Sequence, residues 1–223
     1  MKLILKTICL LSVFGFSLDH PAQKQFTEGM LQYNISITSS KTEAPIANSL
    51  NGATLVVYLK STSSRTEMTS TLGTETTVFD NKNNRGFILK EYSGQKLMIS
   101  MNGNNWDEKN KLYENLDFVI SSEIVKVAGY ACKKAVATLP EGKVFTVYFN
   151  PEILLTNKTY NNAFAQLPGL PVQYELQSGN LNFKYSLSMV NGDAVSQARF
   201  EIPKTGFRVM TYEENQQLKR GGK

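Results

Sequence analysis

Histidine is almost missing from this chain of 223 residues. The single histidine, His20, lies near the N-terminus, ahead of the segments that look able to form a fold. Histidine-based metal sites, Ser-His-Asp triads and Cys-His pairs all need an imidazole inside the folded domain. The sequence therefore excludes these classes of enzyme, and we predict a non-enzymatic protein with no cofactor and no metal site.

Cysteine is equally scarce, with only Cys9 and Cys132 in the whole chain. If the N-terminal segment is removed on export, Cys132 alone remains, and no intramolecular disulfide can form. The two lysines that follow Cys132 could lower the pKa of its thiol and make it reactive. A free cysteine is more often a small buried hydrophobe, and we favour that interpretation.

Long hydrophobic runs are also lacking. The longest uncharged apolar run, Thr7–Phe16, follows Lys2 and Lys6. It falls well short of the roughly 20 residues that a helix needs to span a bilayer. A short apolar run after early lysines is typical of a secretory signal peptide. We therefore expect a periplasmic or secreted protein with no transmembrane span.

Two cleavage positions fit the preference for small residues before the cut, one after Ser17 and one after Ala22. We favour the second, so residues 1–22 are predicted to be the signal peptide. Residues 23–223 show no linker-like break and are predicted to form a single β domain. All-β units of this length are common.

Charge of one sign does not dominate. The chain carries 24 Lys and Arg against 19 Asp and Glu, a formal charge of +5. The only basic cluster, Lys219–Lys223, has the character of a solvated chain end. Because no basic stripe is interleaved with aromatic residues, nucleic acid is not a predicted partner.

What the sequence does contain is apolar residues at every second position. The segments Phe26–Ile37, Val172–Gln177 and Leu181–Met189 alternate apolar and polar residues, as strands with one buried face do. Turn-forming residues separate them from further candidates, which suggests a meander in a sandwich or barrel. The further predicted strands are Ala53–Leu59, Arg65–Thr71, Glu75–Phe79, Gly86–Tyr92, Lys96–Met101, Tyr130–Leu139, Val144–Phe149 and Val195–Ile202.

Two of these strands, Ala53–Leu59 and Val144–Phe149, are apolar on both faces. One face fits an ordinary core, and the other needs a helix, a loop or a bound apolar ligand to cover it. Evidence for helices is limited to a few turns in Asn105–Leu116 and Tyr160–Gln166 and a capped turn at Thr211–Glu214. The more common case is cover by the chain itself.

Three parts of the sequence together resemble the GLPGLI family and related exported bacterial envelope proteins. They are Glu28–Ser36, Gly129–Ala135 with the strand and Asn150–Ile153 that follow it, and Leu167–Leu170. Gln166 and Pro171 stand where the family motif has its first glycine and its final isoleucine. Within the motif, Pro168 and Gly169 predict a type II turn with a positive φ at the glycine.

The resemblance implies an envelope or secreted protein of all-β class with minor helices. Such proteins are similar to the LolA and LolB lipoprotein carriers, in which a curved antiparallel sheet forms an unclosed barrel around an apolar cavity capped by short helices. This half-barrel agrees with the strands that are apolar on both faces.

Our leading functional prediction is that the half-barrel binds a hydrophobic ligand, a lipid or a lipoprotein acyl chain. The alternative is a structural or protein-interaction module of the cell envelope, with a filled core and another envelope protein bound on its surface or on an open sheet edge. The candidate lining residues, chosen by alternation alone, are Leu55, Val57, Phe145, Val147, Tyr174 and Leu187.

Overall fold

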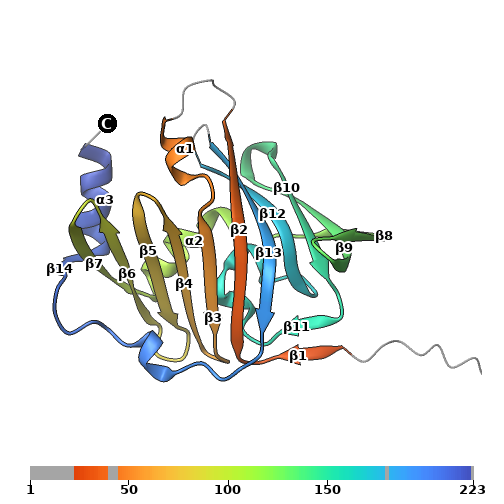
Figure 1. Ribbon diagram of the computed structural model, residues 1–223, viewed down its shortest axis with the longest axis horizontal. Coiled ribbons are helices and arrows are strands. Elements are labelled where there is room, and N and C mark those ends of the chain that lie inside the picture. The colour runs from red at the N-terminus through yellow and green to blue at the C-terminus, as the bar shows by residue number, and fades with distance from the viewer. Residues whose placement is uncertain (1–22, 40–44, 179–180, 222–223) are drawn as a thin grey trace, which may run out of the picture.

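The computed structural model describes residues 23–39, 45–178 and 181–221, so the predicted signal peptide lies outside the described residues. A twelve-stranded sheet dominates the molecule, in the order β14-β7-β6-β5-β4-β3-β2-β13-β12-β10-β9-β8. It is curved and does not close into a barrel (Figure 1). All its neighbours pair antiparallel except β14 with β7, and a small parallel pair, β1 with β11, lies beside it.

The elements have the following bounds. The strands are β1 (Lys24–Phe26), β2 (Gly29–Ser39), β3 (Thr54–Leu59), β4 (Ser63–Ser70), β5 (Gly73–Asp80), β6 (Arg85–Tyr92), β7 (Gln95–Asn102), β8 (Val119–Val127), β9 (Tyr130–Thr138), β10 (Val144–Asn150), β11 (Ile153–Leu155), β12 (Leu170–Ser178), β13 (Leu181–Asn191) and β14 (Arg208–Thr211). The helices are α1 (Pro45–Leu50), α2 (Gly103–Asn110) and α3 (Tyr212–Gly221), with 3₁₀ turns η1 (Lys111–Tyr113), η2 (Pro140–Gly142), η3 (Lys158–Tyr160), η4 (Asn162–Phe164) and η5 (Gln197–Phe200).

The predicted fold class is confirmed: the chain is mostly β, with a large curved antiparallel sheet and a few short helices. Most predicted strands lie within two residues of observed ones. The strand predicted at Val195–Ile202 is wrong, and the sequence pattern missed β8 and the short strands β1, β11 and β14.

The inner face of the sheet is filled by the chain's own side chains and short helices. The main core lies over β2, β3, β9, β10, β12 and β13. It is completed by Phe164 of η4 and by Leu167, which follows η4 in the chain. Tyr33, fully buried in it, donates a hydrogen bond from Oη to the carbonyl oxygen of Pro171 at 2.9 Å. The interior of the half-barrel is therefore packed solid in this part of the sheet.

The other half of the inner face is covered by α2 and α3. Trp106 of α2 stacks on Phe79, with ring centroids 4.3 Å apart, and Tyr212 of α3 packs against the same cluster. Directly paired residues share a face of an antiparallel sheet, which places Ile88 and Ile99 on the same side as Val57. Figure 1 shows α2 behind β4 and β5.

The outer face of β3 to β7 is covered by the segment Val195–Phe207, which we call the outer strap. Val195 and Phe200 pack against apolar residues of β5 and β6, and the Arg199 guanidinium lies 4.2 Å from the ring centroid of Tyr58. The strap cannot join the sheet as a strand because β4, β5 and β6 already have neighbours on both sides. The cover over the outer face of β3 is thus the chain itself.

The turn predicted at Leu167–Leu170 is wrong in its conformation. Gly169 does not have a φ in the left-handed region. A Cβ on Gly169 would instead meet the carbonyl oxygen of Asn150 and would lie 2.6 Å from Cδ2 of Phe149. Glycine is needed here because the chain passes so close to the end of β10.

We expect Gly169→Ala to lower the free energy of unfolding by roughly 1–3 kcal/mol, because the added methyl group forces backbone and core atoms apart. Urea unfolding followed by circular dichroism measures the change. The matched control is Gly192→Ala, since a Cβ on Gly192 meets nothing within 4 Å and its φ is not left-handed. Equal stability of the two variants would contradict the close approach described for Gly169.

Candidate ligand-binding cleft

Strands β10 and β12 pair along only part of their length. Their pairing runs from Asn150 with Leu170 to Val147 with Tyr174. Beyond that point β10 continues to pair with β9, and β12 continues to pair with β13. Among the described residues no pairing joins 144–146 to 175–177. The sheet is therefore split between these two strands, which diverge toward the upper end in Figure 1.

A cleft of about 900 Å³ occupies this split. Its lining includes consecutive residues of both strands, Val144 to Thr146 of β10 and Gln173 to Gln177 of β12. Successive residues of a strand point to opposite faces of a sheet. Lining by consecutive residues therefore means that the cleft lies between the strand edges and is not a pocket on one face.

The two sides of the cleft differ in polarity. The side made by η1, β8 and β10 is largely apolar, with Leu112, Tyr113, Val125, Val127, Val144 and Phe145. The side made by β12 and β13 is largely polar, with Gln173, Glu175, Gln177, Asn182 and Lys184. Such a site suits a ligand that has an apolar part and a polar part.

The floor of the cleft is formed by the rings of Tyr113, Phe145 and Tyr174, and Phe164 and Tyr185 pack against them from the main core. Tyr113 and Phe145 have ring centroids 5.7 Å apart, and Phe145 continues to Phe164 at 6.4 Å. Phe164 meets Tyr174 edge to face at 4.8 Å, and Tyr174 stacks on Tyr185 at 4.7 Å. Aromatic pairs in these geometries stabilise beyond the burial of their area. The floor is thus a continuation of the main core.

The phenols at this floor remain neutral. Burial raises the pKa of Tyr174 well above its usual range and that of Tyr185 to about 12. Both hydroxyl groups therefore keep their protons at neutral pH. The floor presents rings to a ligand without a negative charge.

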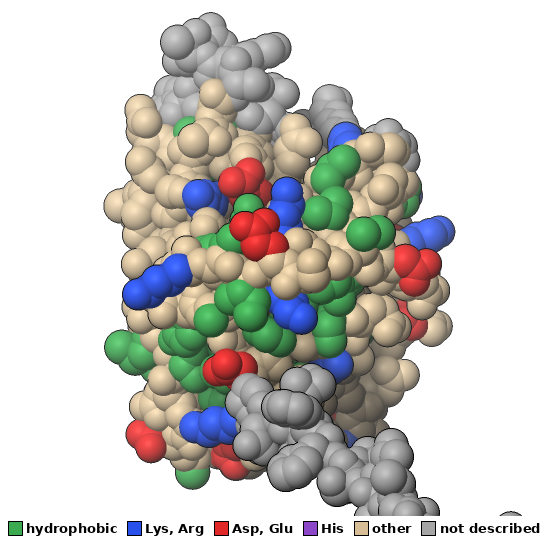
Figure 2. Space-filling view, turned by 90° about the vertical axis from the view of Figure 1, so that its right-hand side faces the viewer, with side chains coloured by type: hydrophobic (Ala, Val, Ile, Leu, Met, Phe, Trp, Pro, Cys, Tyr) green, Lys and Arg blue, Asp and Glu red, His purple; other side chains and the backbone are tan. Residues whose placement is uncertain are grey.

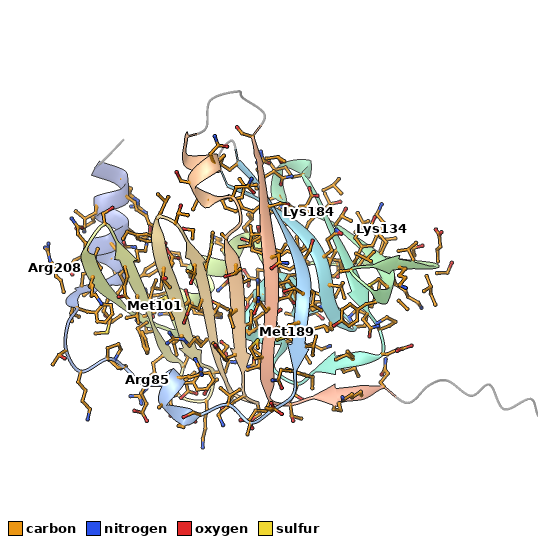
Figure 3. The ribbon with its side chains drawn as sticks, in the orientation of Figure 1. Arg85, Met101, Lys134, Lys184, Met189 and Arg208 are labelled. Atoms are coloured by element: carbon orange, nitrogen blue, oxygen red, sulfur yellow. The ribbon has the colours of Figure 1, made fainter. Side chains whose placement is uncertain are left out.

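The charged residues that line the cleft are Lys143, Glu175 and Lys184. The Glu175 carboxylate accepts a hydrogen bond at Oε2 from Nδ2 of Asn182 at 2.8 Å. Lys184, labelled in Figure 3, is half-buried on β13 and makes no salt bridge within 4 Å to any described residue. The charged lining of the cleft thus combines two lysines with one glutamate.

The six residues predicted from alternation all belong to the main core or pack against it. Phe145 and Tyr174, which are 2% and 3% exposed, line the cleft. Val57, Val147 and Leu187 are buried within the core, and Leu55 packs at its margin. The structure therefore brings two of the six to the cleft.

Sequence reasoning missed the polar side of the cleft. Gln173 and Glu175, like Asn182 and Lys184, fall at the positions that alternation assigns to the wet face of a strand. Their proximity to Val144 and Phe145 depends on where the pairing of β10 with β12 stops. The alternation of apolar and polar residues within each strand does not indicate where this pairing ends.

Cys132 lies in the main core and is completely buried. Burial raises the pKa of its thiol to about 11. Lysine neighbours in the sequence therefore do not produce a low pKa, and the geometry agrees with the interpretation of Cys132 as a small buried hydrophobe.

Comparisons with known proteins give no family. No family model matches the chain, and no curated protein matches it by sequence. Membership of the GLPGLI family therefore stays a prediction. In the described part of the chain, no helix is long and apolar enough to cross a membrane.

Several solved structures share part of the architecture. PNGF-II is 13% identical over 85% of this chain, with a TM-score of 0.46, and the chain spans only 33% of PNGF-II. MucB is 11% identical over 79% of this chain and 58% of its own, with a TM-score of 0.40. LprF from Mycobacterium bovis is 10% identical over 76% of this chain and 88% of its own, with a TM-score of 0.34. Scores this low support no argument about function.

We expect Leu187→Ala to destabilise the fold by roughly 2–5 kcal/mol, because it leaves a void in the main core. Met189→Ala on the same strand is the control, since Met189 is 47% exposed (Figure 3) and its loss should change stability by less than about 0.5 kcal/mol. Urea unfolding of both variants checks the difference. A negligible effect of Leu187→Ala would show that the main core is loosely packed.

We expect the Cys132 thiol to react with a thiol reagent at pH 8 at least tenfold more slowly in the folded protein than in urea, because it is buried and protonated. Since its folded-state pKa is raised, the stability that it contributes is complete below about pH 9 and declines as the pH rises toward 11. Cys132→Ala should lose that part of the alkaline decline. Fast labelling of the folded protein would indicate a reactive cysteine.

Proposed function

We propose that this protein is a non-enzymatic, exported envelope protein that binds an elongated apolar ligand, a lipid or an acyl chain, in the cleft between β10 and β12. The observation that carries the proposal is the cleft itself. Its volume of about 900 Å³ lies within the range of roughly 300–1,000 Å³ typical of small-molecule sites. Aromatic and aliphatic side chains form its floor and one side, as such sites require.

The position of this site differs from the simple picture of a half-barrel with a hollow interior. The inner face of the sheet is occupied by Phe164, Leu167 and Trp106, which come from the chain's own short helices and turns. A ligand would therefore enter the split in the sheet and rest on Phe145 and Tyr174. This arrangement supports binding without a large rearrangement of the main core.

The proposal that the protein is not an enzyme rests on the residues around the cleft. The lining includes neither histidine nor cysteine. Burial raises the pKa of its phenol Tyr174, which therefore stays protonated at neutral pH and is suited neither as a general base nor as a general acid. Export is proposed from the sequence features of residues 1–22.

A second candidate function is favoured by the exposed edge of the sheet. Strand β8 ends the sheet, and Val119 and Ile124 on it are 78% and 63% exposed, while the nearby cleft residue Val144 is 69% exposed. Figure 2 shows hydrophobic side chains on this end of the molecule among charged ones. An exposed apolar edge accepts an added strand, so this candidate is an interaction module that pairs β8 with another envelope protein.

The decisive experiment is organic extraction and mass spectrometry of the mature protein purified from a bacterial periplasm, beside an unrelated exported β protein. We expect a stoichiometric lipid or acyl species that the control lacks. Extracted protein should then bind the neutral fluorescent probe N-phenyl-1-naphthylamine. A clean spectrum together with no probe binding would overturn the ligand proposal and favour the interaction module.

We expect Thr146→Trp to weaken probe binding at least tenfold, because the indole occupies volume in the cleft that Thr146 lines. Fluorescence titration measures the dissociation constant. The control is Thr205→Trp, at an exposed position in the outer strap, which should bind as the unaltered protein does. Equal binding by the two variants would place the probe elsewhere on the molecule.

A further inference from the structure

Among the described residues five lysines are half-buried, and Lys184 is the one of these that lines the cleft. Lys60 and Lys90 form salt bridges with Glu28 at 2.7 Å and with Glu75 at 3.4 Å, whereas Lys133 and Lys158, like Lys184, form none with any residue that the structure describes. Lys184 has no carboxylate within 4 Å in the part of the chain that the structure describes. Its ammonium group therefore lines the cleft without a contact partner of opposite charge.

The nearest acidic residue in the sheet is engaged elsewhere. Glu175 is directly opposite Lys184 in the pairing of β12 with β13. Its carboxylate oxygen Oε2 nevertheless accepts from Nδ2 of Asn182 at 2.8 Å, and no salt bridge joins Glu175 to Lys184. The polar side of the cleft thus combines a cation with an amide group that retains a second N–H.

The opposite side of the cleft is largely apolar in its side chains. Val125 and Val127 of β8 and Val144 and Phe145 of β10 have hydrocarbon side chains, and Lys143 and Thr146 lie beside them in the sequence of the lining. A ligand that fills the cleft therefore meets mainly hydrocarbon side chains on one side and the polar groups of β12 and β13, Lys184 among them, on the other. Complementarity requires that the ligand be apolar along most of its length and negatively charged at one end.

Resting on the proposed function of the cleft, we infer that its ligand is an anionic amphiphile, a long-chain carboxylic acid whose carboxylate pairs with Lys184. Lys184 is the cation that the structure places on the polar side of the cleft. A carboxylate also accepts hydrogen bonds at two oxygens, which matches an ammonium group with an amide beside it. The alkyl chain then lies along β8 and β10.

The test compares two ligands with the same alkyl chain, one with a carboxylate head group and one with a neutral methyl ester. Dodecanoic acid and its methyl ester are each titrated, as monomers at pH 7.5, against extracted protein that holds N-phenyl-1-naphthylamine. Because the probe is neutral, its affinity depends on the apolar lining of the cleft and not on an ion pair with Lys184. We expect the acid to displace the probe at concentrations at least tenfold lower than the ester.

Variants then assign the difference to one side chain. Lys184→Met should weaken the acid about tenfold and leave the ester unchanged, because a hydrogen bond to a charged group is lost. Lys184→Arg should retain the preference for the acid. The control, Lys204→Met, removes an exposed lysine of the outer strap and should change neither ligand.

The outcomes separate the inference from the proposed function. If acid and ester displace the probe equally well in the unaltered protein, the anionic head group is overturned while an apolar ligand site stands. If Lys184→Met weakens both ligands alike, Lys184 acts by packing and the inference fails. If neither ligand displaces the probe and no acyl species is extracted, both the inference and the proposed function are overturned.

Discussion

The structure depends on the need to cover one continuous apolar face of a twelve-stranded sheet. A row of directly paired residues crosses the sheet from Val147 through Tyr174 and Tyr185 to Ile35. An open sheet that carries such a row on its inner face must bury it, and this chain does so with short helices and 3₁₀ turns. Because that cover occupies the inner face, the cleft described above lies instead where two strands separate.

The sequence was a good guide to the strands that have one wet face. In β2, β12 and β13 alternation is strong, so local pattern alone predicted their ends within three residues. Strand β8 was missed because, as an edge strand, it exposes apolar residues and carries Ser121, Ser122 and Glu123 in its middle. Apolar spacing also misled us at Val195–Ile202, where Val195 and Phe200 pack on the sheet face and do not alternate within it.

The cleft was beyond the reach of local reasoning for a different physical reason. Phe145 and Tyr174 were identified as apolar strand residues, but Lys184 and Gln173 carry the pattern of ordinary solvated positions. What makes them one site is the register between β10 and β12 and the point where that pairing ends. Register is fixed by packing across the whole sheet. Similarly, Gly169 was explained by a turn, whereas the structure requires it for close approach to Asn150.

The pairing of β2 with β13 has a consequence for how the chain reaches this structure. Strands β2 to β7 form a meander of sequence neighbours, whereas residues 30–39 of β2 pair with residues 181–191 of β13. Closing so long a loop slows folding. A chain that is made from its N-terminus can build the meander early, but β2 lacks its second neighbour until almost the whole chain is available. Protection of that apolar edge before β13 arrives is thus a requirement built into the topology.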